Sequence, residues 1–426
     1  MGSNPTPSAV GVTVPRLPMA SAGGIRLWTE GNLRMYIGLS PELAALRDEL
    51  RAYYEKLLTP DLEAGLASGE GVGPVARGVW KQMAADGWAG IGWPTEYGGQ
   101  GRTAIEQFIF FDESMRSGAP VPMLTINSVA PTIMRYGTQE QKDFFLPKIL
   151  AGEIHFAIGY TESDAGTDLA SLKTSAVRDG DEYVINGQKV FTSLASDADY
   201  VWLAVRTDPD VKKHKGISII IVPTDTPGFK CEPIRNMANL NTNITLYEDV
   251  RVPVGNLVGE ENQGWGLIVN QLNHERVTLC ASGIVDRQLE DVIAWAKETR
   301  LADGRRVIDQ DWVQLNLARV HARLEYLRLA NWKIADGATR GESLDPAAAS
   351  SIKVFGTEFY LEAFRLLLEI LGPVAYVQGG SPEAVLRGRI ESRVRSMHIL
   401  TFGGGTNEMQ RDLIAIFGLG MPGSPR

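Results

Sequence analysis

Apolar residues recur at intervals of three and four along the first well-patterned stretch of the chain. This stripe consists of Leu43, Leu46, Leu50, Tyr53 and Leu57. Such spacing puts the residues on one face of an amphipathic helix. Ser40 and Pro41 come just before it, and a serine N-cap followed by proline predicts that the helix begins there. Further helical pattern runs over 79–150, interrupted by the loop 90–99.

From about 156 to 258 the period changes to that of strands. Residues 200–205 and 217–222 are runs of β-branched and aromatic residues bounded by turn residues, as expected of buried strands. Asp179-Gly180 and Asn186-Gly187 predict tight hairpin turns, because these residues tolerate positive φ.

Helical pattern returns after Gly264. Two long apolar stripes follow, one of Leu317, Val320, Leu324 and Leu327 and one of Phe355, Phe359 and Leu366 that ends at Gly372-Pro373. Helices, a compact β block and then long antiparallel helices make an α+β layout. No G-x-G-x-x-G follows a strand and opens a helix, which argues against a Rossmann dinucleotide site.

Composition and charge exclude several classes of protein. The 426 residues are 44% hydrophobic and 22% charged, as in soluble globular proteins. A net charge of −9 without a basic stripe argues against a nucleic-acid partner. Cys231 and Cys280 form no disulfide framework, and the five histidines lack metal-ligand spacing. With no apolar run of membrane-spanning length and no signal-peptide pattern, we expect a cytoplasmic protein without a membrane span or a metal.

A candidate ligand site stands out in the β block. Residues 161–168, TESDAGTD, offer hydroxyls and backbone N–H groups in a turn. Residues 186–193, NGQKVFTS, end with an aromatic ring beside two hydroxyls. A loop that donates hydrogen bonds next to a ring that can stack suits a flat heterocycle with polar edges.

In this order and spacing, the two pieces resemble the flavin bed of the acyl-CoA dehydrogenase family. The resemblance covers roughly 36–420 and includes the loop 90–99, GIGWPTEYGG. It implies FAD as cofactor and the acyl-CoA dehydrogenase fold. The domains it implies are an N-terminal helical domain (35–155), a middle β domain with the flavin bed (156–262) and a C-terminal four-helix bundle (263–420). Residues 1–34, rich in Gly, Pro and Ser, are expected to be a disordered extension, and 421–426 a tail.

The resemblance also assigns site residues. Those implied to bind the cofactor are Tyr160, Thr161, Thr167, Phe191, Thr192, Ser193 and Thr406. Those implied to bind the substrate are Thr167, Arg276, Gly403 and Gly404. Phe191 is expected to pack against the isoalloxazine, with Ser193 and Thr161 near its polar edge.

The reaction of this family needs a base, because the α-proton of a thioester is a weak acid and the β-hydride leaves for the flavin. Many members carry the base just before the Gly-Thr of a C-terminal motif, where this chain has Gly404. The isovaleryl- and long-chain-type members instead place a carboxylate on a helix before an arginine, which matches Glu275 and Arg276.

Helical phase supports Glu275 independently. Leu272, Glu275 and Leu279 are spaced by three and four, which puts the carboxylate on an apolar stripe. Burial there would raise the pKa of Glu275 toward neutrality and suit it as a base. The alternative is a structural carboxylate paired with Arg276.

Glycines at 403 and 404 remove side chains where relatives carry a tyrosine or a base. This indicates either a flexible loop or a widened acyl pocket, and the family implies that the Gly404 N–H helps hold the thioester oxygen. Residues 127–134 and 312–321 resemble actinobacterial dehydrogenases that shorten CoA-activated steroid side chains, which implies a bulky acyl-CoA substrate.

Two segments depart from the homotetrameric members, in which each subunit also grips the adenine end of a neighbour's FAD. Thr299 stands where an arginine is expected, and in the turn 369–376 Glu369, Pro373 and Ala375 replace a glutamine and two glycines. The Glu369 carboxylate repels pyrophosphate, Pro373 lacks a backbone N–H donor, and Ala375 adds a side chain where glycine permits close approach. We therefore expect a homologous second subunit in an α2β2 heterotetramer; the alternative is drift compensated by Arg300.

The function predicted from the sequence is FAD-dependent α,β-dehydrogenation of an acyl-CoA, with electrons passed to an electron-transfer flavoprotein. Two alternatives remain open: a flavin monooxygenase or oxidase on the same fold, and a non-catalytic or half-site subunit of a hetero-oligomeric dehydrogenase. Glu275 argues against a monooxygenase or a non-catalytic subunit, because neither needs an α-proton base.

Overall fold

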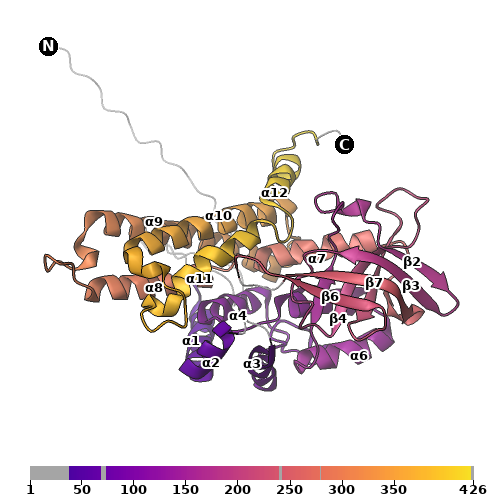
Figure 1. Ribbon diagram of the computed structural model, residues 1–426, viewed down its shortest axis with the longest axis horizontal. Coiled ribbons are helices and arrows are strands. Elements are labelled where there is room, and N and C mark those ends of the chain that lie inside the picture. Colours follow the sequence, from indigo (N-terminus) through magenta and orange to yellow (C-terminus); the bar gives the residue numbers. More distant parts are fainter. Residues whose placement is uncertain (1–37, 69–72, 239–241, 279, 424–426) are drawn as a thin grey trace, which may run out of the picture.

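The structure is a computed structural model that describes residues 38–68, 73–238, 242–278 and 280–423. Within the helix that contains residues 272–278, the backbone is described and these side chains are not. The predicted extension at 1–34 lies outside the described residues. Helices occupy the two ends of the sequence and a sheet the middle (Figure 1).

The first part of the chain is helical. Its helices are α1 (Pro41–Leu57), α2 (Pro60–Ser68), α3 (Gly73–Ala85), α4 (Ala104–Ser117), α5 (Ala130–Tyr136) and α6 (Gln139–Leu150). The predicted start of α1 is confirmed, since the Ser40 hydroxyl accepts the N–H of Leu43 at 3.3 Å. Leu43, Leu46 and Leu50 are buried as predicted, and Tyr54 rather than Tyr53 completes the buried face.

One mixed sheet forms the middle of the chain. Its strands are β1 (Phe156–Gly159), β2 (Ser175–Asp179), β3 (Glu182–Lys189), β4 (Tyr200–Arg206), β5 (Ile217–Pro223), β6 (Phe229–Ile234), β7 (Thr242–Pro253) and β8 (Leu257–Val258). Their order is β6-β7-β3-β2-β4-β5-β8, and β1 pairs with β4 in parallel. Strand β4 is buried on both faces: Val201 and Leu203 join the core of the sheet, while Trp202 and Ala204 join the core shared with the helices.

One of the two predicted hairpin turns is wrong. Asp179-Gly180 does join β2 to β3, but Asn186-Gly187 lies inside β3, where the pairing with β7 shifts register. Gly187 has φ +148°, and a β-carbon there would lie 2.7 Å from the Thr174 backbone, so glycine is needed for close approach in a bulge. The Asn186 amide, which could have bonded within a turn, instead bonds the Asp249 carboxylate at 3.0 Å.

The C-terminal part is a helical bundle. Its helices are α7 (Gly264–Thr278), α8 (Gly283–Glu298), α9 (Asp311–Thr339), α10 (Pro346–Leu371), α11 (Arg389–Ser396) and α12 (Asn407–Leu413). Figure 1 shows α7 lying between this bundle and the sheet, and α12 standing out beyond the rest. The predicted α+β class is confirmed. Among the described residues, no helix is both long and apolar enough to cross a membrane.

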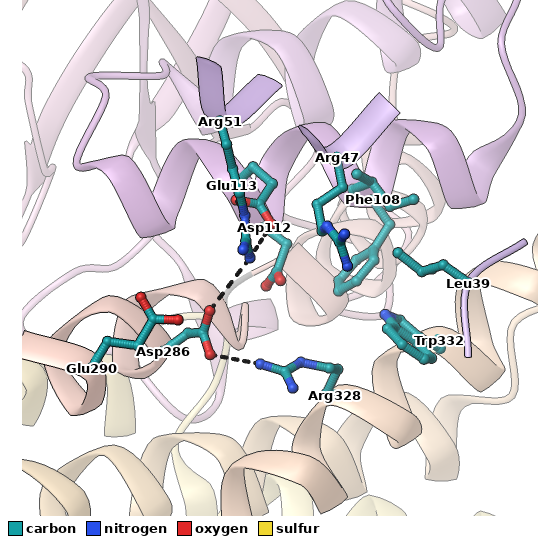
Figure 2. Close-up of a pocket in the computed structure, with 11 residues that line it drawn as sticks. Leu39, Arg47, Arg51, Phe108, Asp112, Glu113, Asp286, Glu290, Arg328 and Trp332 are labelled. Carbon is teal, nitrogen blue, oxygen red and sulfur yellow. Dashed lines mark hydrogen bonds and ion pairs between the residues drawn. The ribbon is translucent and has the colours of Figure 1, made fainter. Parts of the chain in front are cut away.

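A cavity of about 250 Å³ lies where α1 and α4 meet α8 and α9 (Figure 2). Its charged lining residues pair across the helices. Arg51 of α1 bonds both oxygens of Glu113 at 2.9 Å, and Arg328 of α9 bonds Asp286 of α8 at 2.7 Å. Asp286 also lies 3.6 Å from the Arg51 guanidinium, and this ion pair joins the N-terminal helices to the bundle, so we assign the cavity a structural role.

Asp112 of α4 belongs to the same junction. Its carboxylate accepts the Ser282 hydroxyl at 2.8 Å and the Gly283 N–H at 2.8 Å, which ties α4 to the start of α8. Burial raises the pKa of Asp112 to about 6, although the hydrogen bonds from Gly283 and Ser282 lower it. The junction therefore contains a carboxyl group that titrates close to neutral pH.

Candidate functional site

A buried ion pair frames the turn that follows β1. Lys189, at the end of β3, is fully buried and donates to Glu162 at 2.8 Å and to the Tyr160 carbonyl at 3.1 Å. Glu162 also accepts the backbone N–H groups of Lys173 and Thr174 at 2.7 and 2.8 Å. Burial acts to raise the pKa of Glu162, but Lys189 and these donors bring it below its usual value. The carboxylate is thus ionised and holds the turn rigidly.

The predicted flavin residues of this turn have different environments. Tyr160 is buried, Thr161 is half-buried and Thr167 is exposed. The Thr161 carbonyl accepts the N–H of Val190 at 2.9 Å, so the turn lies beside the segment that carries Phe191. The structure therefore brings the two sequence pieces, TESDAGTD and NGQKVFTS, together.

Phe191 presents an aromatic ring to solvent from a strained backbone. Its side chain is 63% exposed, and its φ is +56°. A positive φ is uncommon for a non-glycine residue and costs on the order of 1–3 kcal/mol. An exposed ring held in this way has no role in packing the described core, and it offers a flat surface on which a second ring could stack.

The residues after Phe191 are fixed to β7. Thr192 exchanges two hydrogen bonds of 2.9 Å with Asn243, one from its own N–H and one to its carbonyl, and its hydroxyl lies 3.2 Å from that of Thr245. The Ser193 hydroxyl donates to Thr242 at 3.4 Å. Thr192 is therefore a buried anchor, while Ser193 remains partly accessible beside the ring.

A buried hydrogen bond connects this site to helix α7. The Tyr160 hydroxyl donates to the Gln271 side-chain oxygen, and the Trp202 indole N–H donates to the Tyr160 hydroxyl at 3.1 Å. Gln271 is fully buried. The bond fixes the face of α7 that carries Gln271 toward the strands next to Tyr160.

Glu275 and Arg276 lie on α7, and their side chains are outside the described residues. Position 275 follows Gln271 by four residues, so the two positions share one face of the helix. The helix itself was predicted from the pattern after Gly264, and it begins at that residue.

The predicted substrate loop lies after the bundle. Gly404 and Gly405 have φ of +68° and +90°, and Gly403 is exposed. The Thr406 hydroxyl accepts the N–H of Met409 at 3.3 Å and so caps α12. Helix α10 contacts this loop through Lys353 and packs against α7, so the loop and the predicted flavin bed are connected through these two helices.

Three residues that organise the site were missed at the sequence level: Lys189, Gln271 and Lys353. Each is a polar side chain on a buried face, and for Gln271 and Lys353 the apolar neighbours three or four positions away gave a signal. Leu267 and Ile268 precede Gln271 on the buried side of α7, and the buried Ala349 precedes Lys353 by four positions on α10. Their partners lie far away in the sequence, so spacing could not identify them.

The arrangement fits a flavin better than a metal. Among the residues that the structure describes, no group of three or more His, Cys, Asp or Glu could hold a metal ion. The exposed ring of Phe191, the partly accessible Ser193 and the hydroxyl-rich turn at 161–168 instead match a flat ring with polar edges.

Three family models match consecutive parts of the chain. They are the acyl-CoA dehydrogenase N-terminal domain over 40–153, the middle domain over 157–250 and the C-terminal domain over 262–418. Together they cover most of the chain.

Similar proteins and structures agree with these matches. Acyl-CoA dehydrogenase FadE26 of Mycobacterium tuberculosis is 56% identical over 400 residues, covering 92% of this chain and 100% of that protein. The ChsE4-ChsE5 complex from the same species contains a chain 57% identical, with a TM-score of 0.85 and coverage of 91% and 100%. The Tcur3481-Tcur3483 steroid ACAD gives 51% identity, a TM-score of 0.86 and coverage of 90% and 99%.

Proposed function

The chain belongs to the acyl-CoA dehydrogenase family of oxidoreductases that act on CH–CH groups, and we propose the chemistry of its own site. The chain dehydrogenates the α,β bond of an acyl-CoA thioester with FAD as cofactor. The observation that carries the proposal is the exposed, strained Phe191 ring beside a turn that Tyr160 ties to the helix of Glu275.

Each part of the site has a role in this reaction. When bound, FAD supplies the two-electron acceptor for the hydride. Phe191 would pack against the flavin ring, with Thr161, Thr167 and Ser193 around its polar edge and Thr406 as a further contact from the C-terminal loop. Thr192, which is buried, would fix the segment that carries Phe191. These residues orient the ring and exclude water from it.

The proton is handled by residues of the C-terminal bundle. Glu275 removes the α-proton, and the N–H of Gly404 donates to the thioester oxygen as negative charge develops there. Arg276, next to the base, and Gly403 complete the substrate side. Position 275 shares a face of α7 with Gln271, whose bond to Tyr160 supports this placement.

The substrate class follows from the loop and the relatives. A β-carbon at Gly403 would meet only the Ile399 carbonyl, at 3.9 Å, so the loop leaves open space where a side chain would stand. The Tcur3481-Tcur3483 protein is a steroid ACAD. We therefore assign a bulky, steroid side-chain-type acyl-CoA to this site, and an electron-transfer flavoprotein as the electron acceptor.

The proposed assembly is argued from the two segments that, in homotetrameric members, grip the adenine end of a neighbour's FAD. Glu369 is ion-paired with Arg365 at 2.8 Å, and the Arg300 guanidinium donates to the Gly304 carbonyl within its own loop. The charged groups of both segments are therefore paired within their own segments rather than placed to bind the pyrophosphate of an FAD. ChsE4-ChsE5 and Tcur3481-Tcur3483 are complexes of two different chains. Both facts support an α2β2 heterotetramer in which a homologous subunit grips the adenine.

The test is co-expression with candidate homologous subunits, followed by measurement of assembly mass, flavin content and turnover of a panel of CoA esters. We expect an active α2β2 assembly with about half the FAD of a homotetramer. A stable, fully active tetramer of this chain alone, with one FAD per subunit, would contradict the proposed assembly. Absence of flavin and of turnover in every assembly would contradict the proposed reaction, and oxygen consumption during turnover would indicate an oxidase.

A further inference from the structure

Lys353 lies at the centre of the contacts that hold the substrate loop. It is fully buried on α10. Its ammonium donates to the carbonyl oxygens of Thr401 at 3.0 Å and Gly405 at 2.8 Å, and to the side-chain oxygen of Asn407 at 2.7 Å. These acceptors lie on both sides of Gly403 and Gly404, so a single side chain fixes both ends of the loop.

The chemistry of lysine suits this role. An ammonium has three N–H donors, and three oxygens at hydrogen-bonding distance are arranged around this one. Hydrogen bonds from a charged donor are roughly twice as strong as neutral ones. A loop with consecutive glycines at positive φ has high conformational freedom of its own. Much of the order of the loop therefore comes from Lys353, together with the Gln410 amide, which donates to the Gly404 carbonyl at 3.0 Å.

The same stretch of α10 also holds the segment that follows α7. The Lys353 carbonyl accepts the thiol of Cys280 at 3.7 Å, and burial raises the pKa of that thiol to about 12, so it stays a donor. A β-carbon at Gly356 would lie 2.6 Å from that of Cys280, which shows how closely the two segments pack. The Tyr360 hydroxyl donates to the Ala281 carbonyl. Residues 280–281 are thus fixed to α10 beside the lysine.

We propose that Lys353 is a positioning residue that sets the backbone N–H of Gly404 relative to Glu275. The inference rests on the proposed function, in which the base removes the α-proton while the loop stabilises the oxygen. Lys353 acts through the loop without touching the substrate. A displacement of about 1 Å between such groups can cost on the order of 100-fold in rate.

The test compares Lys353→Met, which keeps an unbranched, slightly shorter side chain and loses the donors, with Lys353→Gln and with Glu358→Gln as a matched control. Glu358 is on the same helix and accepts hydrogen bonds from Asn407 at 3.3 Å and Arg411 at 2.6 Å. It shares Asn407 with Lys353, but neither of its bonds goes to Thr401 or Gly405. The flavin-loaded, active assembly is used throughout. The measurements are kcat, KM, FAD content, melting temperature and deuterium exchange at the substrate α-carbon in D2O.

We expect Lys353→Met to lose about 10- to 100-fold in both kcat and α-deuterium exchange while keeping its FAD. Lys353→Gln, which retains a shorter neutral donor, should lie in between, and Glu358→Gln should keep near wild-type kcat even if it melts earlier. A Lys353→Met enzyme within about twofold of wild type in both rates, or an equal loss in Glu358→Gln, would overturn the inference.

Two further measurements keep the inference testable. If the lysine variants do not fold, Asn407→Ala removes one of the three acceptors, and we expect a smaller loss of α-exchange; wild-type rates there would contradict the role. Amide hydrogen exchange of residues 401–406 reports on the loop without catalysis. If the wild type turns over no ester, the proposed function fails. Faster amide exchange of the loop in Lys353→Met than in Glu358→Gln would still support the positioning role, and equal exchange would contradict it.

Discussion

Tyr160 and Gln271 are 111 residues apart in sequence and share a buried hydrogen bond from the phenol to the amide oxygen. Tyr160 begins the turn of the proposed flavin bed, and Gln271 lies one helical turn before Glu275 on α7. The bond therefore connects the part of the site that would hold the flavin to the helix that carries the proposed base.

Removal of this link should affect both stability and rate. In Tyr160→Phe, the Gln271 oxygen and the Trp202 indole N–H lose their partner, which should cost about 1–3 kcal/mol in the free energy of unfolding. We also expect kcat to fall about 10-fold with FAD retained, because the face of α7 is no longer fixed. The control is Tyr53→Phe, whose hydroxyl bonds Asp86 at an exposed position. Unchanged kcat in Tyr160→Phe, or equal stability losses in both variants, would contradict the link.

The stacking role of Phe191 is tested by its removal. Phe191→Ala should reduce FAD occupancy and shift the visible spectrum of the remaining flavin, because the exposed ring supplies a large stacking surface. Phe144→Ala, at an exposed position on α6, is the matched control and should leave both unchanged. Unaltered flavin occupancy and spectrum in purified Phe191→Ala would count against the flavin bed.

The width of the acyl pocket is tested at Gly403. Its φ is not in the left-handed region and its β-carbon would meet open space, so Gly403→Leu changes volume without backbone strain. We expect the wild type to prefer bulky polycyclic or branched esters to butyryl-CoA in kcat/KM, and Gly403→Leu to penalise the bulky ester more. Equal or better turnover of butyryl-CoA by the wild type would contradict the widened pocket.

The Asp112 carboxyl should make stability depend on pH. Because burial raises its folded pKa to about 6 from 3.8, its neutral form favours folding below about pH 4, and this contribution is lost as the pH rises through 6. Asp112→Asn stays neutral, so its melting temperature should improve relative to wild type between pH 4.5 and 7. A constant difference between the two proteins across that range would show that Asp112 does not titrate there.

The fold was predictable where local chemistry decides it. Ser40 caps α1, the stripe of Leu317, Val320, Leu324 and Leu327 is buried in α9, and Gly372 ends α10 with φ +72°. Each of these depends on residues within one or two helical turns. Asn186-Gly187 failed as a turn because the pairing of β3 with β7 and the approach of Thr174 decided its conformation.

The candidate site was predictable only in part, for the same reason. The pieces around Phe191 and the turn at 161–168 could be placed together by resemblance. The residues that hold them were not apparent, because Lys189 bonds Glu162, Gln271 bonds Tyr160 and Lys353 bonds Gly405 over 27, 111 and 52 residues. Polar side chains at buried helical positions are the general signal for such contacts.

The most direct test of the proposed reaction is the turnover of Glu275→Gln in the active assembly with a bulky acyl-CoA. The amide keeps the shape of the carboxylate and cannot accept the α-proton, so kcat should fall on the order of 10²–10⁴-fold. FAD content and melting temperature should stay near wild type, because the proposed flavin bed lies on other elements. A Glu275→Gln enzyme with near wild-type kcat would contradict the assignment of the base.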